Sequence, residues 1–170
     1  RSFQITNIFP NLTVLENIRL AAQALGRDNF RLFRSHRAFA KYEERAWEVI
    51  EQVGLADEAL LPARTLPHGA QRKLELGMIL APDPEILLLD EPTAGMASEQ
   101  VPELMTLIQK IQAAGHKTVM LVEHNMNVVM SVSDTITVMH HGSVLAEGTP
   151  AEISANETVQ TAYLDHLYEE

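Results

Sequence analysis

The sequence predicts an α/β fold with a parallel sheet core, an α-helical subdomain and a C-terminal helical tail. Between residues 82 and 150, short apolar runs alternate with helical segments, a pattern typical of parallel strands covered by helices on both faces. Residues 5–81 show helical periodicity, and residues 151–170 are again predicted to be helical. The 170 residues are 46% apolar, which is enough to build one packed domain.

Charge and composition exclude several classes of function. The formal net charge is −10, which argues against a nucleic-acid partner because such partners are held through basic contacts to phosphates. Backbone N–H groups can still bind a phosphate at a single site. The sequence has no cysteine, which excludes disulfides and a cysteine nucleophile and fits a reducing cytoplasm. The longest apolar runs, such as residues 86–89, are far shorter than the roughly 18 residues of a membrane span.

The helical half begins with a capping-box pattern. Thr13 is placed to accept the N–H three residues on, and Glu16 is placed to reach back to the start of the helix. The helix that follows has apolar residues at helical spacing, namely Leu15, Ile18, Ala22 and Leu25.

Two further helices are predicted in this half, after a basic stretch at residues 26–37 that contains phenylalanines. One ends at Gly54, and the other spans residues 70–81 and is ended by Pro82 and Pro84. The first of the two has an apolar side made of Phe39, Tyr42, Ala46, Val49, Ile50 and Val53.

The second half is predicted to alternate between strands and helices. Buried strands are expected at residues 86–90, 118–122 and 135–139, and the alternation favours parallel pairing among them. His141-Gly142 predicts a turn into a short hairpin strand at residues 143–146. Helices are expected at residues 98–114 and 125–132, and two more follow a second capping box at Thr149.

The strongest chemical signal is an apolar strand that ends in two acidic residues. Asp90 closes the strand 86–90, and Glu91 follows it directly. Ligands of open parallel sheets bind at this carboxyl edge, where an aspartate can hold Mg²⁺ and a glutamate can activate water. The pattern alone also fits an acidic turn that binds nothing.

Two weaker signals accompany it. In the segment 66–72, Gly69 permits close backbone approach and the following helix N-terminus offers N–H groups to a phosphate. His124 ends a second apolar strand, where an imidazole can donate to a phosphate oxygen. Taken singly, the first also fits an ordinary loop-to-helix junction and the second a structural histidine.

The order of these motifs resembles that of an ATP-binding-cassette (ABC) ATPase over essentially the whole chain. Phe3-Gln4 is similar to the Q-loop of that family, residues 66–72 to its signature motif and residues 86–91 to Walker B. Residues 93–97 are in the place of the D-loop, and His124 is in that of the switch histidine. The resemblance implies part of a P-loop NTPase (RecA-like) domain, with a helical subdomain at 5–81, a core at 82–150 and C-terminal helices at 151–170.

A finer resemblance is to the ATPase subunits of branched-chain amino acid importers. It is carried by FPNLTVLENI at residues 9–18, EPTAGM at 91–96, HGSVLAEGTP at 141–150 and VQTAYL at 159–164. The ATPase subunits of urea and short-chain amide importers are similar in much of these segments and remain an alternative. A non-transport ABC ATPase and a non-catalytic binding module are the other classes left open.

The sequence departs from the family pattern in three places. The Walker A loop, G-x-x-x-x-G-K-[ST], is absent from the 170 residues, so the N-terminal portion of the domain is expected to be missing and this chain alone is expected to bind ATP weakly without turnover. In the signature motif, Pro67 replaces the usual serine and Ala70 the usual glutamine. Ala97 stands where the D-loop usually has Asp or Asn.

The resemblance also implies a role for each motif. Asp90 would hold Mg²⁺, Glu91 would be the general base, His124 would stabilise the transition state, and Gln4 would sense the γ-phosphate and the metal. The signature residues would contact ATP held by a second ATPase subunit, in a homo- or heterodimer: Pro67, His68, Gly69, Ala70 and Gln71.

The implied partners are a transmembrane permease and that second subunit. Residues 5–40 are expected to meet the permease, because they interleave apolar and basic side chains. The protein is expected to be peripheral, on the cytoplasmic face of the membrane, and to make no direct contact with the solute, which is predicted to be small and polar.

Overall fold

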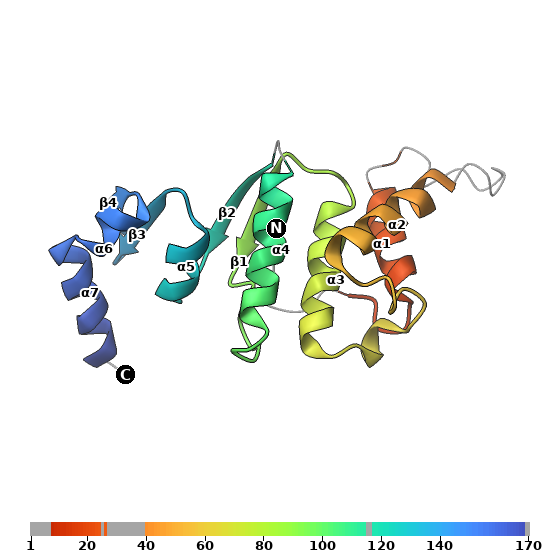
Figure 1. The fold of residues 1–170 in the computed structure, drawn as a ribbon, viewed down its shortest axis with the longest axis horizontal. Coiled ribbons are helices and arrows are strands. Elements are labelled where there is room, and N and C mark those ends of the chain that lie inside the picture. Colours follow the sequence, from red (N-terminus) through yellow and green to blue (C-terminus); the bar gives the residue numbers. More distant parts are fainter. Residues whose placement is uncertain (1–7, 25, 27–39, 115–116, 169–170) are drawn as a thin grey trace. The chain divides into compact units, whose positions relative to one another are not determined.

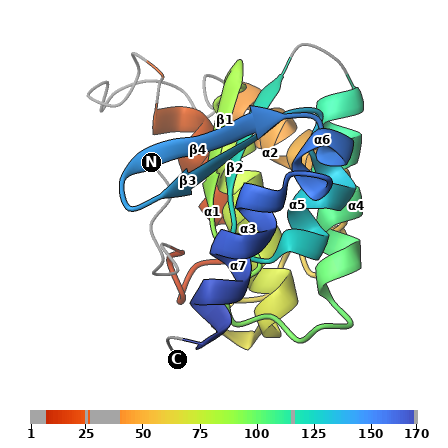
Figure 2. The same ribbon diagram turned by 90° about the vertical axis from the view of Figure 1, so that its left-hand side faces the viewer.

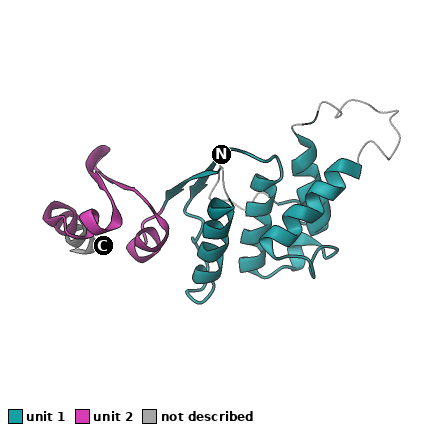
Figure 3. Ribbon diagram, turned by 45° about the horizontal axis from the view of Figure 1, so that its top comes forward, with its two compact units in different colours: residues 1–122 teal, residues 123–170 magenta. Residues whose placement is uncertain are grey.

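The computed structural model describes residues 8–24, 26, 40–114 and 117–168. The chain divides into two compact units, residues 1–122 and 123–170 (Figure 3), and each is described by itself. Gln4 and the phenylalanines of residues 27–39 lie outside the described residues. Within those residues, every helix is too short or too polar to cross a membrane.

The first unit begins with three helices that pack on one another (Figure 1): α1 (Val14–Ala24), α2 (Ala40–Val53) and α3 (His68–Leu80). The sequence predicts all three. The third is expected at residues 70–81, and α3 starts two residues earlier, directly after its N-cap Pro67. Their facing sides form a core of fully buried side chains that includes Ile18, Ala46, Val49, Ile50, Leu74 and Leu80.

The start of α1 confirms half of the predicted capping box. The hydroxyl of Thr13 accepts the N–H of Glu16 at 3.1 Å. The Glu16 carboxylate turns instead to Arg19, 2.6 Å away on the same face of the helix. The hydrogen bond from Arg19 lowers the pKa of Glu16, so the i,i+3 ion pair takes the place of the reciprocal bond.

Arg45 on α2 fixes the C-terminal end of α3. Its guanidinium donates to the carbonyls of Leu80 at 3.1 Å and Ala81 at 3.3 Å, which are among the carbonyls that a helix leaves without an internal partner. It also lies 3.6 Å from Asp83, which pairs with Lys117 at 2.7 Å. The hydrogen bond from Lys117 lowers the pKa of Asp83.

Gly77 allows α3 to approach α1 closely. A Cβ at this position would lie 3.0 Å from Cδ1 of Ile18 and 3.5 Å from Cγ1 of Val49. Both neighbours are fully buried, so a larger side chain has no free volume to enter.

Gly77→Leu is therefore expected to lower the free energy of unfolding by about 1–3 kcal/mol through overpacking. Urea unfolding measures the loss, and the double variant with Ile18→Ala should lose less than the two single variants added together, because the truncation makes room. Strict additivity of the two changes would show that the helices do not meet here.

A pair of parallel strands follows the helices. β1 (Ile86–Asp90) pairs with β2 (Thr118–Val122) in a register that sets Asp90 opposite Val122. The connecting helix α4 (Val101–Ala113) lies beside the pair (Figure 1). The sequence predicts both strands with these bounds, and the helix is shorter than the predicted 98–114.

Among the described residues, the two strands are buried on one face and exposed on the other. Leu87 and Leu89 are buried. The alternate side chains are half exposed or more: Ile86 at 61%, Leu88 at 51%, Met120 at 59% and Val122 at 50%. Side chains alternate along a strand, and the described residues cover only one side of this pair.

The second unit contains α5 (Met126–Val132), β3 (Ile136–His140), β4 (Ser143–Gly148), α6 (Pro150–Ser154) and α7 (Glu157–Tyr168) (Figure 2). The two predicted C-terminal helices are present. Ile136, Ile153 and Val159 form its small core. The capping box at α6 is complete, because Thr149 and Glu152 bond reciprocally.

The third predicted strand has an antiparallel partner within its own unit. β3 pairs antiparallel with β4. The connecting turn has two residues with left-handed backbone, His141 at φ 46° and Gly142 at φ 78°. Such a turn folds the chain straight back, so β3 finds its neighbour locally.

Candidate functional site

The predicted acidic pair lies at the carboxyl end of β1, as the sequence indicates. Asp90 ends the strand with an exposed side chain. The N–H of Glu91 donates to the carbonyl of Val122 at 2.8 Å, so the backbone of Glu91 is still fixed to β2. Its φ of 44° is left-handed, a conformation that costs a non-glycine residue roughly 1–2 kcal/mol.

A tight turn after Glu91 brings the chain away from the strand. The N–H of Ala94 donates to the carbonyl of Glu91 at 3.0 Å, and the N–H of Met96 donates to Thr93 at 3.1 Å. Gly95 has a φ of 73°, which a glycine adopts readily. The segment 91–96 is therefore a hydrogen-bonded structure rather than an open loop.

The segment 66–72 enters α3 with its backbone tightly organised. The N–H of Gln71 donates to the carbonyl of Pro67 at 3.0 Å, and the Gln71 side-chain amide donates to the carbonyl of Leu66 at 2.9 Å. Helix geometry leaves the N–H groups of residues 68–70 available to an outside acceptor. Pro67 and Ala70 add no polar side chain, so His68 and the backbone supply the polar groups of this end.

The structure brings the segments 66–72 and 91–100 side by side within the first unit. A Cβ on Gly69 would lie 3.1 Å from Cδ of Gln100. A Cβ on Gly95 would lie 3.6 Å from Cε1 of His68. Arg72 donates to the carbonyl of Ala94 at 3.1 Å.

His124 belongs to the second unit and lies just before α5. The next residue, Asn125, caps α5 by accepting the N–H groups of Asn127 at 3.1 Å and Val128 at 3.4 Å. This cap fixes the backbone that follows His124.

The carboxyl edge of β1 fits a magnesium ion. The described ranges hold no cluster of three or more His, Asp or Glu side chains that would enclose a metal. Mg²⁺ does not need one, because it is usually held by one or two carboxylates, with phosphate and water completing the octahedron. Asp90, with its exposed carboxylate at the strand end, is a suitable protein ligand of this kind.

Sequence reasoning missed Asn17. Its side chain is fully buried, accepts the N–H of Phe9 at 2.7 Å and donates to the carbonyls of Phe9, Leu12 and Thr13 at 3.1, 3.4 and 2.8 Å. The sequence does offer one signal for Asn17, which is its position on α1. Asn17 stands three residues after Val14 and next to Ile18, so it is a polar residue on the apolar face of α1.

Comparison with known proteins identifies the family. The profile of the ABC transporter family matches residues 2–94, and that of the branched-chain amino acid ATP-binding cassette transporter matches residues 143–164. The chain belongs to the ABC transporter family.

Among its relatives are two branched-chain amino acid transport ATP-binding proteins. BraF of Pseudomonas aeruginosa is 39% identical over 170 residues, and LivG of Escherichia coli is 38% identical over 174 residues. Each alignment covers 96% of this chain, and the chain spans 66% of the length of the relative.

Solved structures confirm the predicted fold class. An ATP-binding cassette of an ABC transporter superposes with a TM-score of 0.77 at 24% identity, covering 96% of this chain and 67% of that one. The dimeric post-hydrolysis state of another cassette, bound to ADP and Pi, superposes with a TM-score of 0.68 at 29% identity, covering 87% and 61%. The α/β fold is that of the P-loop cassette ATPases.

Proposed function

We propose that this chain is part of the ATPase subunit of an ABC importer, which couples ATP hydrolysis to uptake of a small polar solute, most specifically a branched-chain amino acid. The observation that carries the proposal is the similarity to BraF and LivG over 96% of the chain. It is supported by the placement of Asp90 and Glu91 at the carboxyl end of β1, where ligands of parallel sheets bind.

In this proposal Asp90 holds Mg²⁺ and Glu91 is the general base. When bound, Mg²⁺ would neutralise the phosphate oxygens of ATP. Glu91 orients the attacking water and accepts its proton. The backbone bonds of Glu91 to Val122 and Ala94 hold the base in place before the substrate arrives. By resemblance to the family, His124 and Gln4 are proposed to contact the transferred phosphoryl group.

The segment 66–71 is proposed to contact ATP held by a second ATPase subunit. The dimeric cassette structures among the relatives support such a pairing. Pro67 and Ala70 supply no side-chain donor, so the N–H groups at the start of α3, together with His68, would carry the contact to the nucleotide. Gln71 would support this contact by ordering the start of α3, because its side-chain amide donates to Leu66 and its N–H donates to Pro67.

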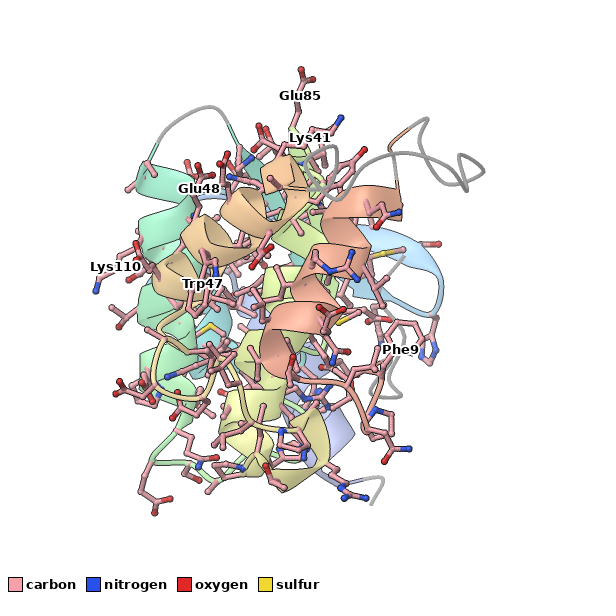
Figure 4. All side chains as sticks on the ribbon, turned by 90° about the vertical axis from the view of Figure 1, so that its right-hand side faces the viewer. Phe9, Lys41, Trp47, Glu48, Glu85 and Lys110 are labelled. Atoms are coloured by element: carbon pink, nitrogen blue, oxygen red, sulfur yellow. The ribbon has the colours of Figure 1, made fainter. Side chains whose placement is uncertain are left out.

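The loop before α1 is the proposed permease surface. Phe9, Leu60 and Leu61 are exposed at 51%, 70% and 47%. Figure 4 shows Phe9 at the surface ahead of α1. The two segments that carry these residues are tied together, because Val14 donates to the carbonyl of Leu61 at 3.1 Å and Arg64 donates to that of Pro10 at 3.0 Å. Exposed apolar side chains on two segments joined by hydrogen bonds fit a protein interface.

A photo-crosslinker placed at Phe9 in the assembled transporter is therefore expected to label the permease. The same crosslinker at Glu51, on the exposed side of α2, is the control and should label it much less. If only crosslinkers placed within residues 140–170 label the permease, the assignment of the loop is wrong.

Reconstitution tests the whole proposal. The full-length gene product is to be reconstituted with its permease in liposomes, with the ATPase and ATP on the luminal side. It is expected to hydrolyse ATP and to accumulate labelled leucine in the lumen. The 170-residue chain alone, which has no Walker A loop, should show no turnover. Uptake of urea or a short-chain amide in place of leucine would assign the protein to that class of importer, and ATP hydrolysis without any uptake would favour a non-transport ATPase.

A further inference from the structure

Arg72 joins α3 to the turn that follows Glu91. Its side chain is only 12% exposed. One terminal nitrogen, Nη1, lies 2.8 Å from Oε2 of Glu75, and the other, Nη2, donates to the carbonyl of Ala94 at 3.1 Å. The guanidinium therefore spans two elements, its own helix and the turn 91–96.

The guanidinium of Arg72 makes only one contact with the carboxylate of Glu75, and its other terminal nitrogen bonds to Ala94. A guanidinium and a carboxylate pair best through two parallel hydrogen bonds. Here Nε of Arg72 and Oε1 of Glu75 are both buried without a hydrogen-bond partner among the described residues. Leaving a buried donor and acceptor unused carries a cost, so the contact with Ala94 is the one that sets how the guanidinium lies.

The turn that Arg72 holds leads directly to Glu91. Ala94 donates its N–H to Glu91 and accepts from Arg72 through its carbonyl. The same turn contains two left-handed residues, Glu91 at φ 44° and Gly95 at φ 73°. Unusual backbone conformations persist only where surrounding contacts over-determine them, and Arg72 supplies a contact from outside the turn.

We propose that Arg72 is a positioning residue for Glu91: it fixes the turn 91–94 against the start of α3 and so holds the general base in its working position. The inference rests on the proposed function of Glu91. It gives the segment 66–72 a second task, within its own subunit, in addition to its contact with the nucleotide of the other subunit.

The test compares Arg72, near the start of α3, with Arg45, which donates to carbonyls at the end of α3. In the full-length gene product with its permease, Arg72→Met is expected to lower kcat on the order of 10- to 100-fold, a loss typical of a misplaced catalytic group. The KM for ATP should change much less, because Asp90 is untouched. Arg72→Lys should restore part of kcat, since an ammonium can donate to Ala94. Arg45→Met, which removes the contacts to Leu80 and Ala81, should reduce stability and leave kcat near wild type.

Hydrogen–deuterium exchange gives a readout that does not depend on activity. Arg72→Met should speed amide exchange in residues 91–96, whereas Arg45→Met should not. Wild-type kcat and unchanged exchange for Arg72→Met, alongside an inactive Glu91→Gln, would overturn the positioning role and leave the proposed function standing. Wild-type turnover by Glu91→Gln would overturn the proposed function of Glu91, and the exchange data would still report whether Arg72 holds the turn. If Arg72→Met does not fold, Arg72→Lys decides the question. We then expect a kcat below wild type and faster exchange in residues 91–96, because one ammonium replaces a guanidinium that spans two contacts, and wild-type values of both would overturn the positioning role.

Discussion

Glu91→Gln is expected to reduce ATP turnover by about 10²- to 10⁴-fold in the full-length protein, the usual loss when a general base is removed. The amide has nearly the shape of the carboxylate but cannot accept the proton of the attacking water. The backbone bonds of residue 91 to Val122 and Ala94 do not involve the side chain, so the turn should survive. ATP binding should persist, and a closed dimer with trapped ATP should accumulate.

Two further variants separate this result from a general loss of structure. Asp90→Asn should weaken Mg²⁺ binding, so that affinity for the nucleotide falls together with turnover. His124→Ala should resemble Glu91→Gln in rate while ATP still binds. Turnover by Glu91→Gln within about threefold of wild type would reassign the base, and Glu91 would be left as a carboxylate at a strand end.

Asn17→Ala is expected to lower the free energy of unfolding by about 2–4 kcal/mol. The side chain makes four hydrogen bonds to the backbone of Phe9, Leu12 and Thr13, each worth about 1 kcal/mol net. Removing the amide takes the acceptor from the N–H of Phe9 beside a fully buried position, which adds a desolvation cost. The three carbonyls still accept backbone N–H groups from Leu12, Ala63 and residue 17. Denaturant unfolding monitored by circular dichroism measures the change.

Asn17→Asp is a second test of the same site, in which the shape of the side chain is kept. The carboxylate can still accept the N–H of Phe9, but it cannot donate to the three carbonyls, and its charge would be buried. The loop 9–13 should lose its order in both variants, so crosslinking from Phe9 to the permease should fall in parallel with stability. A loss below about 1 kcal/mol for Asn17→Ala would show that the loop is held mainly by its bonds to residues 61–64.

The sequence by itself determined the local elements and the order of the motifs. Helical spacing predicted α1, α2 and α4, apolar runs predicted β1 and β2, and the capping box at Thr149 is present in full. These features depend on contacts within a few residues, which a sequence displays directly. The order of the motifs indicated the ABC family, which the match over residues 2–94 confirms.

Only the tertiary structure decided which groups meet across the chain. The antiparallel pairing of β3, the half-exposed face of β1 and β2 and the burial of Asn17 depend on what each element packs against. Arg72 and Ala94 are 22 residues apart, and no periodicity links them. A local pattern fixes the direction in which a side chain leaves its own helix or strand, but the partner that it reaches is set by how distant elements come together.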